Sequence, residues 1–161
     1  MNPNPYSKLV HCKQWADRNL HETVAANFDR LDAEEQTILL MILDHILVVD
    51  RIFRSHLMGQ AHSFTAPRSD ALPGIGELAN TAHFVDDWYV SHVDCLTAET
   101  FDEPLDFTFT SGKQARMTRG EIILHVCEHG TYHRGNAGIL FQKKGIAPGN
   151  DGITNYLEAA A

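Results

Sequence analysis

The stretch TRGEIILHVCEHGTYHRGNAGILFQKKG, residues 118–145, predicts one long helix. Thr118 followed three residues later by Glu121 fits a capping box, and two lysines before Gly145 are typical of a helix end. Between these signals, one stripe recurs at three- and four-residue steps: Ile122, His125, Val126, His129, His133, Ala137 and Leu140. The stripe predicts that this helix buries one face and that three imidazoles lie on it.

Two earlier stretches predict long helices of matching length. One begins at Asn4-Pro5 and runs to about residue 30, and the other runs from Asp32 to about Met58. A third apolar stripe, between Leu78 and Leu96, predicts a helix that ends near residues 97–100. The three longest helices each span about 26 residues, which is about 39 Å. Amphipathic helices of this kind predict an all-α four-helix bundle, a single domain over residues 1–161.

The connections between these helices differ in length. Residues 60–74 are rich in Ser, Pro, Gly and Ala without a period, which predicts a long crossover connection. Apolar and polar residues alternate around a Ser-Gly turn in residues 105–117, which predicts a small β-hairpin insertion before the last long helix. A short additional helix is expected at Ile153–Ala159 in the tail.

The composition limits the partners. The chain of 161 residues has 13 Lys+Arg against 21 Asp+Glu, a formal net charge of −8. An acidic chain without a Lys/Arg run offers no surface for phosphate backbones or anionic lipids, so we expect no nucleic acid and no membrane as a partner. The longest apolar run is far shorter than a membrane span, and the first nine residues are polar and carry no export signal. With three cysteines and no CxxC pair, we expect a cytoplasmic protein.

The ten histidines are the unusual feature of the composition. Histidines four residues apart on a helix climb about 6 Å, so His125 and His133 lie about 12 Å apart in height and cannot share one ion at metal–nitrogen distances of about 2 Å. One ion can instead be shared by neighbours on the stripe, either His125 with His129 or His129 with His133. A third ligand must come from a facing helix, and His45 or His56 is available on the stripe of the second helix. These two are about 16 Å apart along that helix, so only one can meet the pair.

Such a site predicts chemistry rather than structural support. Three neutral imidazoles leave a divalent ion an open position, where water can have a pKa of about 7 or a thiol can bind as thiolate. A chain of this size does not need a metal in order to fold. The competing interpretation treats each histidine as a core residue bonded to a carbonyl. However, several unpaired buried imidazoles would cost roughly 1 to 3 kcal/mol each, a cost that a shared ion removes.

The run HVCEH also matches H-x-x-E-H, a signature of zinc proteases. In this interpretation His125 and His129 bind zinc and Glu128 is the general base. A downstream acid would complete the site, and only Asp151 and Glu158 remain. A peptide cleft is hard to build from so short a chain, so this interpretation is the less favoured one.

The run HGTYHRGN, residues 129–136, preceded by His125, resembles the C-terminal signature of the DinB family of damage-inducible bacterial proteins. These proteins are unrelated to the DNA polymerase of the same name. The resemblance extends to WADRNL at residues 15–20 and to HILVVDRIF at residues 45–53, and so covers nearly the whole chain.

The resemblance implies a fold and a ligand set. Members are four-helix bundles, commonly homodimers, that hold a divalent metal, zinc or nickel, on one histidine of the second helix and two of the late helix. By position, the implied ligands are His45, His129 and His133. His125 and Arg134 become candidates for orienting the ligands or an acidic substrate group. Asn136 stands where the family usually has Gln, and this shorter amide leaves the role of that position open.

The resemblance also implies a class of reaction. Relatives include thiol-dependent enzymes, a mycothiol-dependent maleylpyruvate isomerase and bacillithiol S-transferases. We therefore expect a metal-dependent transferase that activates a low-molecular-weight thiol toward a small-molecule electrophile, or a hydrolase that activates water. The alternative is a non-enzymatic metal-binding protein of the stress response.

Overall fold

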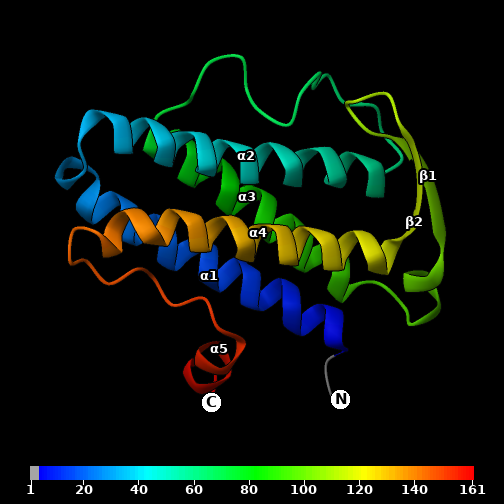
Figure 1. Cartoon of the computed structure of the whole chain (residues 1–161). Coiled ribbons are helices and arrows are strands. Elements are labelled where there is room, and N and C mark those ends of the chain that lie inside the picture. Colours follow the sequence, from blue (N-terminus) through cyan, green and yellow to red (C-terminus); the bar gives the residue numbers. More distant parts are fainter. Residues whose placement is uncertain (1–3) are drawn as a thin grey trace.

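The structure, a computed structural model, describes residues 4–161, so residues 1–3 of the polar start lie outside it. Four long helices lie side by side (Figure 1): α1 (Pro5–Asn27), α2 (Ala33–Leu57), α3 (Ile75–Asp94) and α4 (Arg119–Gln142). Both α1 and α2 pack against α3 and α4. The predicted all-α four-helix bundle is therefore confirmed.

The starts of three helices follow the local signals in the sequence. The Asn4 side chain accepts a hydrogen bond from the Ser7 N–H at 2.7 Å, and Pro5 occupies the first turn of α1. Complete capping boxes begin α2, at Asp32, and α4, at Thr118. These side chains bond the free N–H groups of the first turn, which explains why the three starts were predictable.

Two helix ends differ from the prediction. Helix α1 stops at Asn27, and residues 28–30 form a 3₁₀ turn instead of continuing the α-helix. Helix α3 stops at Asp94 rather than near residues 97–100, and a 3₁₀ helix follows at Glu99–Asp102. Leu96 still packs against the core from the turn, so the apolar pattern continues past the end of the helix.

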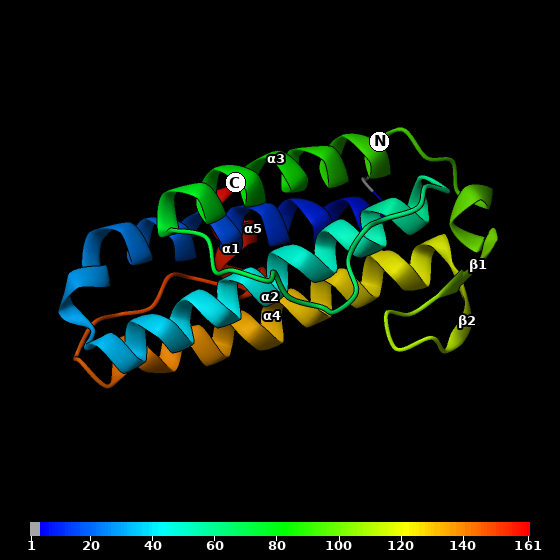
Figure 2. The same ribbon diagram turned by 90° about the horizontal axis from the view of Figure 1, so that it is seen from above.

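The hairpin and the crossover lie outside the bundle. Strands β1 (Pro104–Thr108) and β2 (Gln114–Thr118) pair antiparallel at one end of the helices, with Phe107 opposite Ala115 (Figure 1). The crossover, residues 60–74, follows α2 back to the start of α3, as seen from above in Figure 2. The short helix α5 (Ile153–Ala159) packs against α1.

The core lies between the four long helices. All of them contribute apolar side chains with at most 1% exposure, among them Val10, Leu39, Val85, Ile122 and Val126. In the described part of the chain, no helix is both long and apolar enough to cross a membrane.

Candidate metal centre

Three imidazoles converge where α2 faces α4. His129 and His133 stand one turn apart on α4, and His45 meets them from α2. The Nε2 atoms of His45 and His129 are 3.0 Å apart. One ring nitrogen from each of the three lies within 4.8 Å of the other two. The structure thus brings together the three histidines that the resemblance implied as ligands, and their role as ligands stays a prediction.

The crossover orients His45. Its Nδ1 lies 2.7 Å from the carbonyl oxygen of Pro67. A carbonyl only accepts, so Nδ1 carries the proton and the lone pair of Nε2 faces His129. Metal-binding histidines typically have their other ring nitrogen fixed in this way.

The residue before His45 holds the same crossover. Asp44 is 1% exposed and accepts hydrogen bonds from the Ser69 N–H at 2.8 Å and the Ser69 hydroxyl at 2.6 Å. Two consecutive residues of α2 therefore fix two nearby residues of the crossover. Neither Asp44 nor Pro67 was predicted from the sequence. The available signal for Asp44 was a single acid inside the apolar run ILDHILVV.

Burial favours the neutral form of the two imidazoles on α4. Burial, together with the neighbouring His133 and His45, lowers the pKa of His129 to about 3. Burial and the nearby His45 also lower the pKa of His133. Neutral imidazole nitrogens with free lone pairs suit borderline divalent ions such as zinc or nickel, so the residues present fit such an ion.

His125 and His56 both lie outside this group. The His125 ring is 5.6 Å from the His129 ring and 4.6 Å from that of Phe53. The His56 ring stacks on Phe107 at 4.3 Å, toward the hairpin. Of the alternatives that spacing left open, the structure brings together His45 with the pair His129 and His133.

Arg134 has different partners from those that the sequence suggested. Its Nη1 donates to Asp17 at 2.9 Å, and its Nε and Nη2 both donate to Asp151 at 2.8 Å. Successive residues of a helix differ by about 100°, so the residue after His133 faces α1 and the C-terminal segment. A Cβ at Gly130 would lie 2.8 Å from Arg134 Nη1, so the glycine leaves room for the guanidinium.

The same geometry bears on the zinc-protease interpretation. The Asp151 carboxylate, one of two acids available to complete an H-x-x-E-H site, is held by Arg134. Glu158, the other acid, is exposed on α5. Within the described residues, the histidines grouped with His129 are His45 and His133.

A buried ionic cluster lies between α1, α2 and α3, and we name it the lysine cluster: Lys13, Asp17, Asp50 and Asp86. The Lys13 ammonium lies 2.7 Å from Asp17, 2.8 Å from Asp50 and 2.6 Å from Asp86. Its side chain is 2% exposed. Three carboxylates in this arrangement could also surround a metal ion, but here the ammonium lies between them. Our sequence analysis missed this cluster.

The lysine cluster does not titrate as isolated carboxylates would. Burial would raise the pKa of Asp17, but its contacts with Lys13 and Arg134 outweigh burial and lower it. Burial raises the pKa of Asp50 to about 6 despite Lys13, and burial raises that of Asp86 well above its usual range. Asp50 Oδ1 and Asp86 Oδ2 have no hydrogen-bond partner among the described residues. Burial in the cluster therefore makes Asp50 and Asp86 hold a proton to higher pH than an exposed aspartate does.

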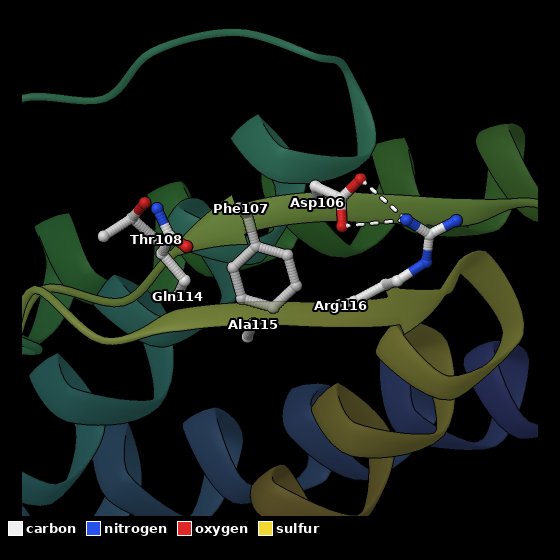
Figure 3. A pocket seen from close by; sticks show the side chains of 6 residues that line it. All are labelled: Asp106, Phe107, Thr108, Gln114, Ala115 and Arg116. Carbon is white, nitrogen blue, oxygen red and sulfur yellow. Dashed lines mark hydrogen bonds and ion pairs between the residues drawn. The ribbon is translucent and has the colours of Figure 1, made fainter.

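Two hollows include histidines of this group, and Pro67 lines both of them. One of about 320 Å³ includes His129 in its wall, and the other, of about 690 Å³, includes His45. A separate hollow of about 460 Å³ lies on the hairpin, where Arg116 pairs with Asp106 (Figure 3). Its six lining residues include no histidine, so we do not assign it to the metal centre.

Comparison with known proteins gave one result. The family model described as "DinB family" matches residues 1–161, the whole chain. Searches of curated proteins and of solved structures gave no match.

Proposed function

The chain belongs to the DinB family, whose proteins bind metal, and from this premise we propose that it is a metal-dependent enzyme. The proposed ligands are His45, His129 and His133. The observation that carries the proposal is the convergence of three imidazole nitrogens within 4.8 Å of one another. The rings are only partly buried, so a small molecule can reach them.

The proposed reaction transfers a low-molecular-weight thiol to an electrophilic small molecule, or adds water to it. A divalent ion supplies Lewis acidity, which lowers the pKa of a thiol or water at its open position. The chain supplies three neutral nitrogens, of which the Pro67 carbonyl orients that of His45. This arrangement leaves part of the coordination sphere to a substrate.

The surroundings favour a thiol over water. Asp44, the acid next to His45 in the chain, already accepts two hydrogen bonds from Ser69 and is not a free base. A nucleophile that loses its proton without help from Asp44 therefore has the advantage. On a zinc ion a coordinated thiol would be deprotonated outright, whereas bound water would have a pKa of about 7.

Elemental analysis of the purified protein tests the metal. We expect zinc or nickel at about one ion per chain, with three imidazole ligands by X-ray absorption spectroscopy. Four protein ligands would instead indicate a closed structural or storage site, which is typical of the non-enzymatic alternative.

A substrate screen tests the reaction. Metal-loaded protein is incubated with a panel of thiols with electrophiles and with a panel of esters, and the thioether and hydrolysis products are measured. We expect turnover by the wild type, loss of turnover in His129→Ala, and retention in His11→Ala. His11 is a matched control because it lies on α1 and bonds Asp94. A metal-loaded protein without turnover on any thiol or ester would contradict the enzyme proposal and favour the non-enzymatic stress-response protein.

A further inference from the structure

The hollow of about 320 Å³ beside His129, which we name the apolar hollow, is built from four parts of the chain. Helix α2 contributes Ile52 and Phe53, the crossover contributes Pro67, the hairpin tip contributes Phe109 and Thr110, and α4 contributes His129. It therefore lies directly beside the three converging imidazoles. Its volume falls in the range of small-molecule sites.

Its wall is mostly apolar and includes the aromatic rings of Phe53 and Phe109. Among its described lining residues there is no Asp, Glu, Lys or Arg. The Phe53 ring lies 4.6 Å from that of His125 and 6.4 Å from that of Phe109. The hollow of about 690 Å³ beside His45 differs, because Asp44, Arg68 and Asp70 line it. A charged group would lose hydration in the apolar hollow, and no Asp, Glu, Lys or Arg of its wall would compensate for that loss, whereas a neutral ring would gain contacts.

The hairpin tip forms the outer part of this wall. The Phe109 N–H donates to the Lys113 carbonyl at 2.9 Å, and the Gly112 N–H donates to the Phe109 carbonyl at 2.8 Å. Gly112 has a φ of +83°, a conformation that favours glycine in such a turn. Phe107 and Phe109 both lie against Phe53 of α2. These aromatic contacts therefore hold the hairpin tip against α2, beside the apolar hollow.

We propose that the apolar hollow binds the uncharged aryl or alkyl part of the small-molecule substrate. That this ligand is a substrate rests on the proposed function, whereas the binding of an apolar group in the hollow does not. The hairpin is then the specificity-determining part of the fold, because its tip closes the hollow that adjoins His129.

Ligand binding without turnover tests this proposal. Zinc-loaded protein, with no thiol present, is titrated with neutral indole and with anionic benzenesulfonate by saturation-transfer NMR. We expect indole to bind with a dissociation constant on the order of 1 mM, typical of so small a ligand, and benzenesulfonate to bind at least about tenfold more weakly. Equal binding of the two probes would overturn the proposal.

Two matched substitutions locate the probe. Thr110 lines the apolar hollow, whereas Thr108 lines the separate hollow of Figure 3. We expect Thr110→Trp to weaken indole binding at least about tenfold and Thr108→Trp to leave it within about twofold. Ser111→Trp, at an exposed position of the same tip, is a second blocking variant. Equal effects of the variants at 108 and 110 would refute the location.

The two proposals fail in different ways. Indole binding that Thr110→Trp abolishes, in a protein without thiol turnover, would refute the enzyme proposal and support the apolar hollow. Turnover in a protein that does not bind indole would refute the apolar hollow alone.

Discussion

The Nδ1 atom of His45 lies 2.7 Å from the carbonyl oxygen of Pro67. Through this bond the crossover orients the imidazole that α2 presents to α4. The preceding residue, Asp44, holds Ser69 through two hydrogen bonds. The crossover is therefore part of the candidate metal centre as well as a connection between helices.

This relationship predicts a loss of metal affinity without a change of ligand. Ser69→Ala removes the hydroxyl that donates to Asp44 at 2.6 Å, and Asp44→Ala removes both hydrogen bonds between Asp44 and Ser69. Loss of such supporting contacts typically costs about 10- to 100-fold in metal affinity. We expect the effect of Asp44→Ala in this range and that of Ser69→Ala to be smaller, in a zinc titration with a competing chelator.

The matched control is Ser91→Ala. Ser91 also donates through its hydroxyl, but to the Asp87 carbonyl on α3. The zinc affinity of Ser91→Ala should equal that of the wild type. An equal loss in Ser69→Ala and Ser91→Ala would indicate a general effect on the fold and contradict the role of the crossover.

A second prediction ranks the histidines. His133→Ala should abolish tight zinc binding, because two imidazoles remain where three converge. His125→Ala should weaken zinc binding about 10- to 100-fold at most, since its ring lies beside His129, at 5.6 Å, and outside the group of three. The same competition titration measures both.

The opposite ranking would support the H-x-x-E-H interpretation. Glu128→Gln also distinguishes the two interpretations. Glu128 would be the general base of an H-x-x-E-H protease, but it has no assigned role in a site made of His45, His129 and His133. We expect Glu128→Gln to change neither zinc affinity nor thiol turnover by more than about twofold.

Much of the fold could be predicted because its signals are local. The helix starts at Asn4, Asp32 and Thr118 depend on side chains that bond the nearest N–H groups. The end of α3 depends on a distant contact instead. Asp94 accepts a hydrogen bond from Ser7 of α1, and Leu96 reaches the core without being helical. Periodicity alone therefore placed this end too late.

The candidate site was predictable only in part, for the same reason. Histidines at core positions of a stripe are visible in the sequence, but spacing alone did not choose between His45 and His56. The Pro67 carbonyl depends on the path of a segment without periodicity. Lys13 is buried only because α1, α2 and α3 meet around it. Sequence patterns usually place charged residues at the surface, so they gave no prediction of the lysine cluster.

Removal of the metal should leave the fold intact. The core contains apolar side chains from all four long helices, and a chain of this size does not depend on a metal for folding. We expect the far-ultraviolet circular dichroism at pH 7 to be the same with and without chelator, apart from a lower midpoint of thermal unfolding. A chain that unfolds in chelator would show the site to be structural.

Acid should remove the metal before it unfolds the protein. Free imidazole has a pKa of about 6.5, but burial lowers the pKa values of His129, to about 3, and of His133. Both rings therefore stay neutral below pH 6.5 and still bind an ion there. The neutral rings of His129 and His133 contribute fully to the free energy of unfolding above pH 6.5, and this contribution is lost as the pH falls toward their pKa values in the folded protein. We expect half of the zinc to be lost below pH 6.5, in dialysis with metal analysis, while the circular dichroism stays helical. Simultaneous loss of zinc and helix would contradict this order.

The lysine cluster predicts a pH dependence of opposite sign. Asp50 of α2 faces Lys13 and Asp17 of α1 and Asp86 of α3, and Arg134 of α4 lies beyond Asp17. Its pKa is about 6 in the folded protein, above the ordinary value of 3.8. Between these values the folded chain holds a proton that the unfolded chain has lost, so this group lowers the free energy of unfolding as the pH rises from about 4 to 6.

Replacement of Asp50 by Asn tests this dependence, because Asn cannot ionise and its amide oxygen can still accept a hydrogen bond from Lys13. We therefore expect the free energy of unfolding of Asp50→Asn, relative to the wild type, to rise from pH 4 to pH 7. Urea unfolding in the presence of chelator measures it without a contribution from metal binding. Asp87→Asn, at an exposed carboxylate that pairs with Arg18, is the matched control and should show no such trend. A relative stability of Asp50→Asn that falls over this range would show that Asp50 is ionised in the folded cluster.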